Sequence, residues 1–379
     1  ETELSNLCNK MTELEKTLQT SQSEINRLND LFVLLDLSPS EQKNIMEIAE
    51  KFPISIPAYY LSLINKEDKN DPIRKMAIPS EFEKDLEGTF DTSGEGDNTV
   101  ITGMQHKYNE TVMILSTNQC AMYCRHCFRK RLVGLSDEEI AKHFEEMAQY
   151  IKEHKEISNV LISGGDSLVN SNTKIEYLLK LFTSIDNLDF IRFGTRIPVV
   201  MPQRISEDLQ LLEILKKYSK KKQIYIVTQF NHPNEVTEES KKAIKMLQKI
   251  GIVVKNQTVL LKGVNDDSHV LGSLLKKLTS IGVVPYYIFQ CRPVKGVKGQ
   301  FQVPFERGYE IIEGAKAMQN GQGKCFKYCF SCESGKIEVV GKLGDEMIFK
   351  FHEAKYEKDY GRIFTKKLEK DTCWLYDID

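Results

Sequence analysis

The feature that most constrains the fold is an alternation along residues 112–322. Short runs of β-branched residues alternate there with longer amphipathic stretches, a pattern typical of parallel strands joined by crossover helices. Polar and glycine residues follow each short run, at the edge where α/β barrels carry their chemistry. The pattern predicts an α/β fold, a partial (β/α)6 TIM-like barrel. We expect its six strands at residues 112–116, 159–163, 190–195, 223–228, 252–260 and 283–290.

Three further regions flank this barrel of residues 112–322. Residues 1–51 predict N-terminal helices, and the heptad over residues 4–28 fits either an amphipathic helix packed on its own protein or a coiled coil. A second helix, 36–52, opens with the capping sequence Ser38-Pro39-Ser40-Glu41. Residues 52–111 form a lead-in segment that we expect to pack on the barrel. After a last helix at 306–320, residues 323–379 predict a small C-terminal β region, with strands at 336–340 and 347–351.

The charge balance indicates a small-molecule partner. The chain has 52 Lys and Arg against 54 Asp and Glu, a net charge of -2, and no long block of one sign. We therefore expect no nucleic-acid partner, and no apolar run is long enough to predict a membrane span. The nine cysteines are an odd number, and six of them fall in two clusters. This favours a reducing cytoplasmic location and metal ligation over disulfides.

The first cysteine cluster begins four residues after the first predicted strand, at Cys120, Cys124 and Cys127. A four-iron cluster needs four ligands, so three thiolates would leave one iron open to chelate the amino and carboxylate groups of a small molecule. The spacing predicts such a [4Fe–4S] cluster. A zinc site or reduced cysteines in the core are the alternatives.

The second cluster, Cys325, Cys329 and Cys332, repeats the same spacing. It fits an auxiliary iron–sulfur cluster or metal site, with Cys291 at the end of the last predicted strand as a fourth ligand. Reduced thiols in a β-turn region are the alternative.

Several motifs in register, between about Phe52 and Val340, resemble one family. They are YYLSLI at 59–64, NDPIRK at 70–75, the segment 120–131, SGGD at 163–166, PVVMPQR at 198–204, FNHPNE at 230–235, GVND at 263–266 and PYYI at 285–288. The chain resembles the radical S-adenosylmethionine superfamily and, within it, the lysine 2,3-aminomutase family. Its substrate positions are closer to the glutamate-type or uncharacterised members than to the lysine enzyme. The resemblance implies an isomerase with a [4Fe–4S] cluster, S-adenosylmethionine and pyridoxal phosphate.

The resemblance also assigns residues. Gly164, Gly165 and Asp166 would recognise the methionine amino group, and Arg129 would bind the substrate α-carboxylate as a planar guanidinium can. Lys336 would carry pyridoxal phosphate, although composition alone makes it a surface lysine. The same cavity would be lined by His126, Thr195, Arg196, Gln229, Asn231 and His232, where a structural role is the alternative for the histidines and Arg129 could belong to a solvated basic run.

Departures from the family bear on the cofactor and the substrate. At two positions where the family has arginines, at least one of them near the cofactor phosphate, this chain has Lys107 and Thr111. Asn256 and Gln257 remain as candidates to bind that phosphate. Two aspartates that hold the lysine ammonium read Arg292 and Cys329. An Arg in place of an Asp inverts the charge, which argues against lysine and favours a side chain ending in a carboxylate, as in glutamate. An internal ion pair of Arg292 is the alternative.

We therefore predict an aminomutase in which the 5'-deoxyadenosyl radical removes hydrogen from Cβ and the amino group moves from Cα to Cβ. A reductase, flavodoxin or ferredoxin would donate the electron, and we expect a homo-oligomer. A second hypothesis replaces pyridoxal phosphate with an auxiliary metal at the second cysteine cluster and a different radical reaction. A third is a non-catalytic scaffold or redox sensor.

Overall fold

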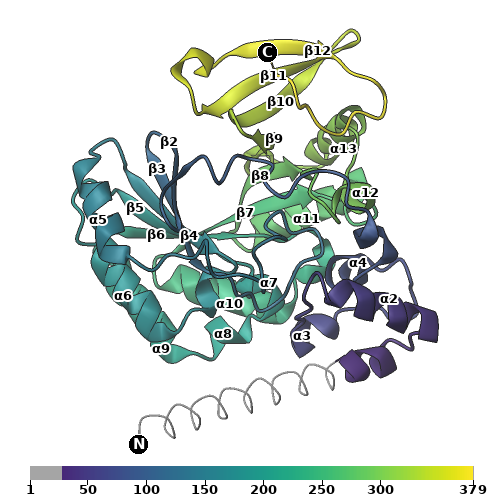
Figure 1. Cartoon of the computed structure of the whole chain (residues 1–379), viewed down its shortest axis with the longest axis horizontal. Coiled ribbons are helices and arrows are strands. Elements are labelled where there is room, and N and C mark those ends of the chain that lie inside the picture. The colour runs from purple at the N-terminus through teal and green to yellow at the C-terminus, as the bar shows by residue number, and fades with distance from the viewer. Residues whose placement is uncertain (1–27, 379) are drawn as a thin grey trace, which may run out of the picture.

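The computed structural model describes residues 28–378. They form a single mixed sheet whose twelve strands follow chain order from β1 to β12 (Figure 1). The first and last strands do not pair with each other, so the sheet is open, as expected for a partial barrel. The predicted heptad lies outside the described residues except for Leu28.

The six predicted barrel strands are confirmed, and all pair in parallel. They are β3 (Thr111–Thr117), β4 (Asn159–Gly164), β5 (Phe190–Gly194), β6 (Gln223–Thr228), β7 (Val253–Leu260) and β8 (Val284–Gln290).

The second cysteine segment differs from the expectation of a β-turn region. Residues Lys327–Cys332 form β9, a seventh parallel strand that pairs with β8. Because five of its six residues are buried, the segment folds as a core strand. The remaining strands are antiparallel: β1 (Thr99–Ile101), β2 (Met104–Tyr108), β10 (Gly335–Leu343), β11 (Glu346–Ala354) and β12 (Ile363–Lys367). The last three form the yellow sheet at the top of Figure 1.

Helices cover the outer face of the parallel strands (Figure 1). The long ones are α5 (Phe144–Glu153), α6 (Asn172–Phe182), α9 (Leu209–Ser219), α10 (Glu238–Lys249), α11 (Ser268–Ser280) and α13 (Phe305–Ala317). Short helices α7 (Ile197–Val200), α8 (Gln203–Ser206) and α12 (Lys298–Phe301) lie in the connections. Strand residues that face the helices are buried, whereas alternate residues of β5 and β7, on the inner face, are half-buried. The inside of the barrel is therefore not completely filled.

Helices also precede the barrel. The N-terminal region contains α2 (Pro39–Ala49), and the lead-in segment contains the short helices α3 (Ala58–Leu61) and α4 (Pro72–Ala77) and the 3₁₀ turn η1 (Glu81–Lys84). Ser38 and Glu41 form the predicted capping box at the start of α2. Tyr60 is fully buried and donates a 2.6 Å hydrogen bond to Glu235 Oε1, which ties α3 to the barrel.

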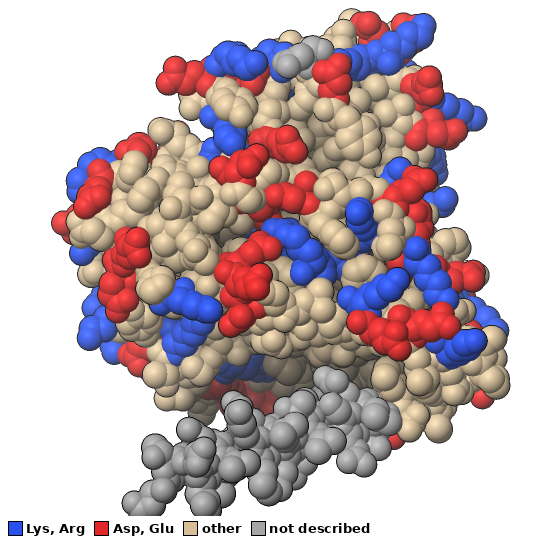
Figure 2. Space-filling model, viewed as in Figure 1, with Lys and Arg blue, Asp and Glu red and all other residues tan. Residues whose placement is uncertain are grey.

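On the face drawn in Figure 2, Lys and Arg are intermixed with Asp and Glu, without a broad patch of one sign. In the part of the chain that the structure describes, no helix has the length and apolar character of a transmembrane segment.

Candidate active site

The cysteine loop follows β3 directly. The thiols of Cys120, Cys124 and Cys127 are half-buried and free. Burial, followed by the charges of Asp166, Cys127 and Cys124, raises the pKa of Cys120 well above its usual value. Arg196 Nη1 lies 2.8 Å from Cys124 Sγ. No three Cys, His, Asp or Glu side chains within residues 28–378, this loop included, already stand in a metal-ligand arrangement.

One buried nitrogen on this loop has no hydrogen-bond partner. His126 is 5% exposed, and its Nδ1 atom is unpaired among the described residues. Its Nε2 atom lies 3.2 Å from Asn231 Nδ2 and 3.4 Å from Gln229 Nε2. Burial lowers the pKa of His126 well below its usual value, so the ring is neutral. A buried, unsatisfied polar atom beside three thiols fits a site that binds a polar ligand.

Gly164 and Gly165 bring the end of β4 against the cysteine loop. A Cβ atom on Gly164 would lie 2.2 Å from the Thr117 carbonyl oxygen, and its φ of +117° also favours glycine. A Cβ atom on Gly165 would lie 2.2 Å from the Gln119 carbonyl oxygen. The two glycines therefore permit the backbone contact that fixes the residues before Cys120.

The Asp166 carboxylate is occupied by internal hydrogen bonds. It accepts from the Thr195 hydroxyl at 2.5 Å and from the backbone N–H groups of Arg196 and Leu168 at 2.6 and 3.0 Å. Asp166 thus joins the ends of β4 and β5. Arg196 in turn pairs with Glu235 at 2.5 Å, which places its guanidinium between that carboxylate and Cys124.

Other predicted cavity residues form structural contacts. Asn231 Oδ1 accepts from Val259 N at 2.9 Å, and His232 Nδ1 accepts from Asn234 N at 3.2 Å as a cap. Asn256 is buried and exchanges hydrogen bonds with the backbone of Phe230, so its side chain lies on the outer face of β7. Gln257 and Gln229 are half-buried, and Gln257 is on the inner face of β7.

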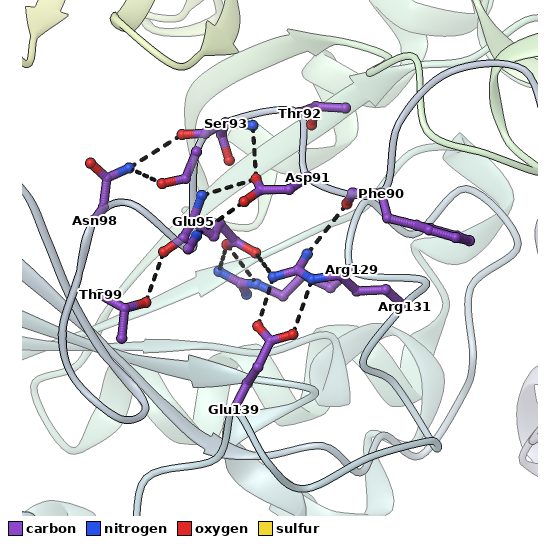
Figure 3. Close-up of polar contacts among 12 residues, drawn as sticks. Phe90, Asp91, Thr92, Ser93, Glu95, Asn98, Thr99, Arg129, Arg131 and Glu139 are labelled. Atoms are coloured by element: carbon purple, nitrogen blue, oxygen red, sulfur yellow. Dashed lines mark hydrogen bonds and ion pairs between the residues drawn. The ribbon is translucent and has the colours of Figure 1, made fainter.

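Arg129 lies in an ion-pair network with Glu95, Arg131 and Glu139, in which Arg129 and Glu95 are buried and Glu139 is exposed (Figure 3). Glu95 binds Arg129 and Arg131, both at 2.8 Å, and Arg131 also binds Glu139 at 2.8 Å. Although burial opposes ionisation, the two guanidinium groups lower the pKa of Glu95 to about 2. The remaining contacts of Arg129 are to Ser163 Oγ, the Gly164 carbonyl oxygen and Met113 Sδ.

Arg292 lies next to this network. Its guanidinium and that of Arg129 are 4.2 and 4.6 Å from the centre of the Phe128 ring. Arg292 donates to Ser93 Oγ at 2.8 Å and Thr92 Oγ1 at 3.4 Å, and forms no ion pair within residues 28–378. The alternative of an internal ion pair is thus not seen there.

Lys107 is a second cation beside Arg292. Its Nζ donates to the carbonyl oxygens of Ser93, at 3.2 Å, and Cys332. Burial, together with the charge of Arg292, lowers the pKa of Lys107 to about 8. Thr111, the other position where a family arginine is expected, begins β3 opposite Tyr108, the neighbour of Lys107, and its hydroxyl accepts from Asn159 Nδ2 at 3.0 Å.

Lys336 is at the start of β10, with its side chain 13% exposed. Its Nζ lies 2.7 Å from Glu353 Oε2, 4.4 Å from the centre of the Tyr287 ring and 5.7 Å from that of Tyr108. Tyr287 shares a 2.7 Å hydrogen bond with His352. An amine between aromatic rings beside a carboxylate suits a lysine that holds an aromatic cofactor.

Sequence comparisons decide the family. Residues 114–271 match the model of the Radical SAM superfamily. The L-lysine 2,3-aminomutase of Acetoanaerobium sticklandii is 40% identical over 303 residues, covering 79% of this chain and 72% of that protein. The chain belongs to the lysine 2,3-aminomutase family.

A glutamate 2,3-aminomutase of Clostridioides difficile is equally similar, with 40% identity over 301 residues, 78% of this chain and 70% of that protein. Overall identity therefore does not separate the two substrates. A radical SAM methyltransferase of Sphaerobacter thermophilus, a solved structure, has 14% identity and a TM-score of 0.39, covering 60% of this chain and 68% of that one.

Membership of this aminomutase family confirms the expectation of an enzyme over a scaffold or sensor. It implies a [4Fe–4S] cluster and S-adenosylmethionine. The chain fits both groups, because Cys120, Cys124 and Cys127 supply three thiols on one loop beside the unpaired Nδ1 of His126.

The second cysteine cluster does not form a comparable group. Cys329 and Cys332 are three residues apart on β9, so their side chains point to opposite faces, and Cys325 is exposed. Burial raises the pKa of Cys329 to about 12, and the charges that contribute are those of Lys and Glu residues rather than thiols. Cys291, the expected fourth ligand, instead lies near Cys373.

Several charged or polar residues near the candidate active site were not identified from the sequence. Glu95 and Ser93 lie in a segment without helix or strand, where the sequence has no hydrophobic periodicity from which their positions could be predicted. Arg192 and Lys255 had a detectable signal, since each is a charge in the middle of a predicted barrel strand.

Proposed function

We propose that the enzyme is a pyridoxal phosphate-dependent 2,3-aminomutase whose substrate is an α-amino acid with an anionic side chain, glutamate being the best fit. The single observation that supports this is Arg292. Arg292 is half-buried, and within residues 28–378 its guanidinium donates hydrogen bonds to two hydroxyl groups and forms no ion pair with a carboxylate. A partly buried charge without an ion pair is well placed to bind a ligand that supplies the opposite charge.

The surroundings of Arg292 favour a carboxylate over an ammonium. The charge of Arg292 contributes to the lowered pKa of Lys107, so a second cation lies near Arg292, and the Glu95 carboxylate also acts on Arg292. The ammonium of a lysine substrate would meet repulsion here, whereas a side-chain carboxylate would be bound bidentately by the planar guanidinium.

Arg129 remains our candidate to bind the α-carboxylate. Glu95 and Ser163 hold one side of its guanidinium, while Nη2 also contacts the Met113 sulfur at 2.9 Å. A thioether is a weak acceptor, so a substrate carboxylate would replace this contact at a net gain. Glu95 then fixes the orientation of Arg129.

When bound, the cluster and S-adenosylmethionine supply the radical, and pyridoxal phosphate supplies the group to which the migrating nitrogen is attached. The protein's own residues position the cofactor and the substrate and move protons. Lys336 would hold the cofactor, and Glu353 Oε2, 2.7 Å away, is placed to take the proton that Lys336 must lose. The electron donor, the homo-oligomer and the cytoplasmic location remain as predicted from the sequence.

The test is substrate binding to the anaerobic holoenzyme and to Arg292→Gln. We expect glutamate to bind the wild type far better than lysine. Loss of one charged, bidentate contact should weaken glutamate binding by about 10- to 100-fold, with cleavage of S-adenosylmethionine retained. Arg307→Gln, which removes an exposed guanidinium from α13, is the matched control and should bind glutamate normally. Unchanged glutamate affinity in Arg292→Gln, or preferential binding of lysine, would refute the proposal.

A further inference from the structure

Two cations lie on the inner face of the barrel strands. Arg192 is the middle residue of β5, and Lys255 is near the start of β7; both are half-buried. Tyr225 of β6 is directly opposite Arg192 in the sheet, and Lys255 is diagonal to Tyr225 on the next strand. The three side chains therefore line one inner layer of the barrel.

Arg192 is incompletely paired. Its Nη2 donates to Asn159 Oδ1 at 2.5 Å, whereas its buried Nε has no partner among the described residues. Asn159 is held in turn by Glu110 O and Thr111 Oγ1, so the guanidinium is anchored from one side and open on the other. Nothing in the reaction described above uses this group.

Lys255 has no ion pair within residues 28–378 either. Its Nζ lies 4.9 Å from the centre of the Tyr225 ring and 4.6 Å from that of Tyr286. Aromatic faces stabilise an ammonium only partly, so two cations in one half-buried layer favour the binding of an anion that carries more than one charge.

The layer adjoins Lys336. Lys255 Nζ lies 4.6 Å from the centre of the Tyr286 ring, and that ring centre is 4.1 Å from the centre of the Tyr287 ring. Lys336 Nζ in turn lies 4.4 Å from the centre of the Tyr287 ring and 2.7 Å from Glu353 Oε2. The charges of Glu353 and Tyr287 also act on Arg192. Glu353 forms its ion pair with Lys336, so Arg192 has no ion-pair partner among the described residues and can bind an anion. A ligand that is linked to Lys336 at one end can thus place its other end near Arg192.

We propose that Arg192 and Lys255 form the phosphate site for the cofactor held by Lys336. The inference rests on the proposed function, because it takes pyridoxal phosphate as the ligand. Phosphate matches the site, since it carries about two charges and three acceptor oxygens, and a guanidinium with an unpaired N–H binds it directionally. Lys107 does not serve this purpose, because it already donates to two carbonyl oxygens beside Arg292.

The test compares pyridoxal phosphate with pyridoxal, which lacks the phosphate. Binding to the anaerobically reconstituted protein is followed by visible absorbance, and borohydride reduction followed by peptide mass analysis shows attachment to Lys336. We expect the wild type to prefer the phosphorylated form by about 100-fold or more. Arg192→Gln and Lys255→Gln should each lose about 10-fold or more of that preference, while their pyridoxal affinity is unchanged.

Controls separate folding from binding. Iron content and cleavage of S-adenosylmethionine report whether a variant is folded, and Arg192→Lys should retain part of the preference. Lys245→Gln, an exposed lysine on α10, should behave as wild type.

Full preference in both Gln variants, or loss of preference in Lys107→Gln alone, would overturn the inference and leave the proposed function intact. A wild-type protein that binds neither pyridoxal form would overturn both.

Discussion

At the residue scale, a few charges decide what this enzyme can bind. Arg292 and Cys329 stand where the lysine enzymes are expected to have two aspartates, and the structure surrounds Arg292 with hydroxyl groups instead of carboxylates. In contrast, Arg129 has a permanent carboxylate partner in Glu95. The two arginines that contact the Phe128 ring therefore differ in their partners: Arg129 has a carboxylate partner, whereas the hydrogen bonds of Arg292 are to hydroxyl groups.

Replacing Lys336 by Ala tests the cofactor assignment. The variant should no longer retain pyridoxal phosphate covalently after borohydride reduction, because Ala has no amine. It should still cleave S-adenosylmethionine, since the cysteine loop is on a different element. Lys350→Ala, an exposed lysine of the neighbouring strand β11, is the control. A labelled peptide at another lysine in the Lys336 variant would show that the assignment is wrong.

The sequence could predict the residues of the cysteine loop but not their partners. The spacing of the three cysteines by itself predicts metal ligation, and the glycine pair can be located because it follows a predicted strand. Glu95, however, reaches Arg129 from 34 positions earlier in the chain, in a segment without periodicity. For Asp166, the resemblance predicts a contact with the methionine amino group, and the structure adds hydrogen bonds from Thr195 and Arg196 that join β4 to β5.

At the element scale, the strand pattern was the reliable signal, since buried parallel strands are continuous apolar runs bounded by polar turns. All six barrel strands could be predicted in this way. Strand β9 could not be predicted, because its cysteines have the spacing of metal ligands and the segment was therefore not recognised as a buried strand. The inner and outer faces of β7 were also indistinguishable in the sequence, so Asn256 and Gln257 were both expected to face the cofactor.

The contact between β4 and the cysteine loop gives a prediction at this scale. Gly165→Ala places a methyl group 2.2 Å from the Gln119 carbonyl oxygen, so the loop must move. We expect a loss of about 1–3 kcal/mol in unfolding free energy and a lower iron content after reconstitution. Gly321→Ala, where the added Cβ meets nothing within 4 Å, should leave both quantities near wild type. Full iron loading and full stability in Gly165→Ala would contradict this account of the glycine pair.

On the scale of the whole molecule, buried ion pairs join the lead-in region to the barrel. Glu83 of η1 binds Arg125 and Lys130 on the cysteine loop at 2.5 and 2.6 Å, and Glu95 binds Arg129 and Arg131 on the same loop. The opposite charges lower the pKa of both carboxyl groups, although burial opposes this. The segment before the barrel therefore holds the loop that carries Cys120, Cys124 and Cys127.

This network predicts acid sensitivity. The pKa of Glu95 is about 2 in the folded protein against an ordinary 4.5, so its stabilisation is fully present above pH 4.5 and is lost as the pH falls towards 2. Glu95→Gln should lower the unfolding free energy near neutral pH by about 3 kcal/mol, and the difference from wild type should shrink below pH 4.5. Urea unfolding at several pH values measures this.

The control is Glu310→Gln, which breaks an exposed ion pair of α13 and should change the unfolding free energy by less than about 1 kcal/mol. A Glu95→Gln variant as stable as wild type near neutral pH, or one whose deficit stays constant on acidification, would count against the network.

The most direct test of the account is product analysis. The anaerobic holoenzyme, with pyridoxal phosphate, S-adenosylmethionine and a strong reductant, would be given equal amounts of L-glutamate and L-lysine. We predict 5'-deoxyadenosine together with the β-amino isomer of glutamate, and no β-lysine. Formation of β-lysine, or cleavage of S-adenosylmethionine without a β-amino product from either amino acid, would contradict it.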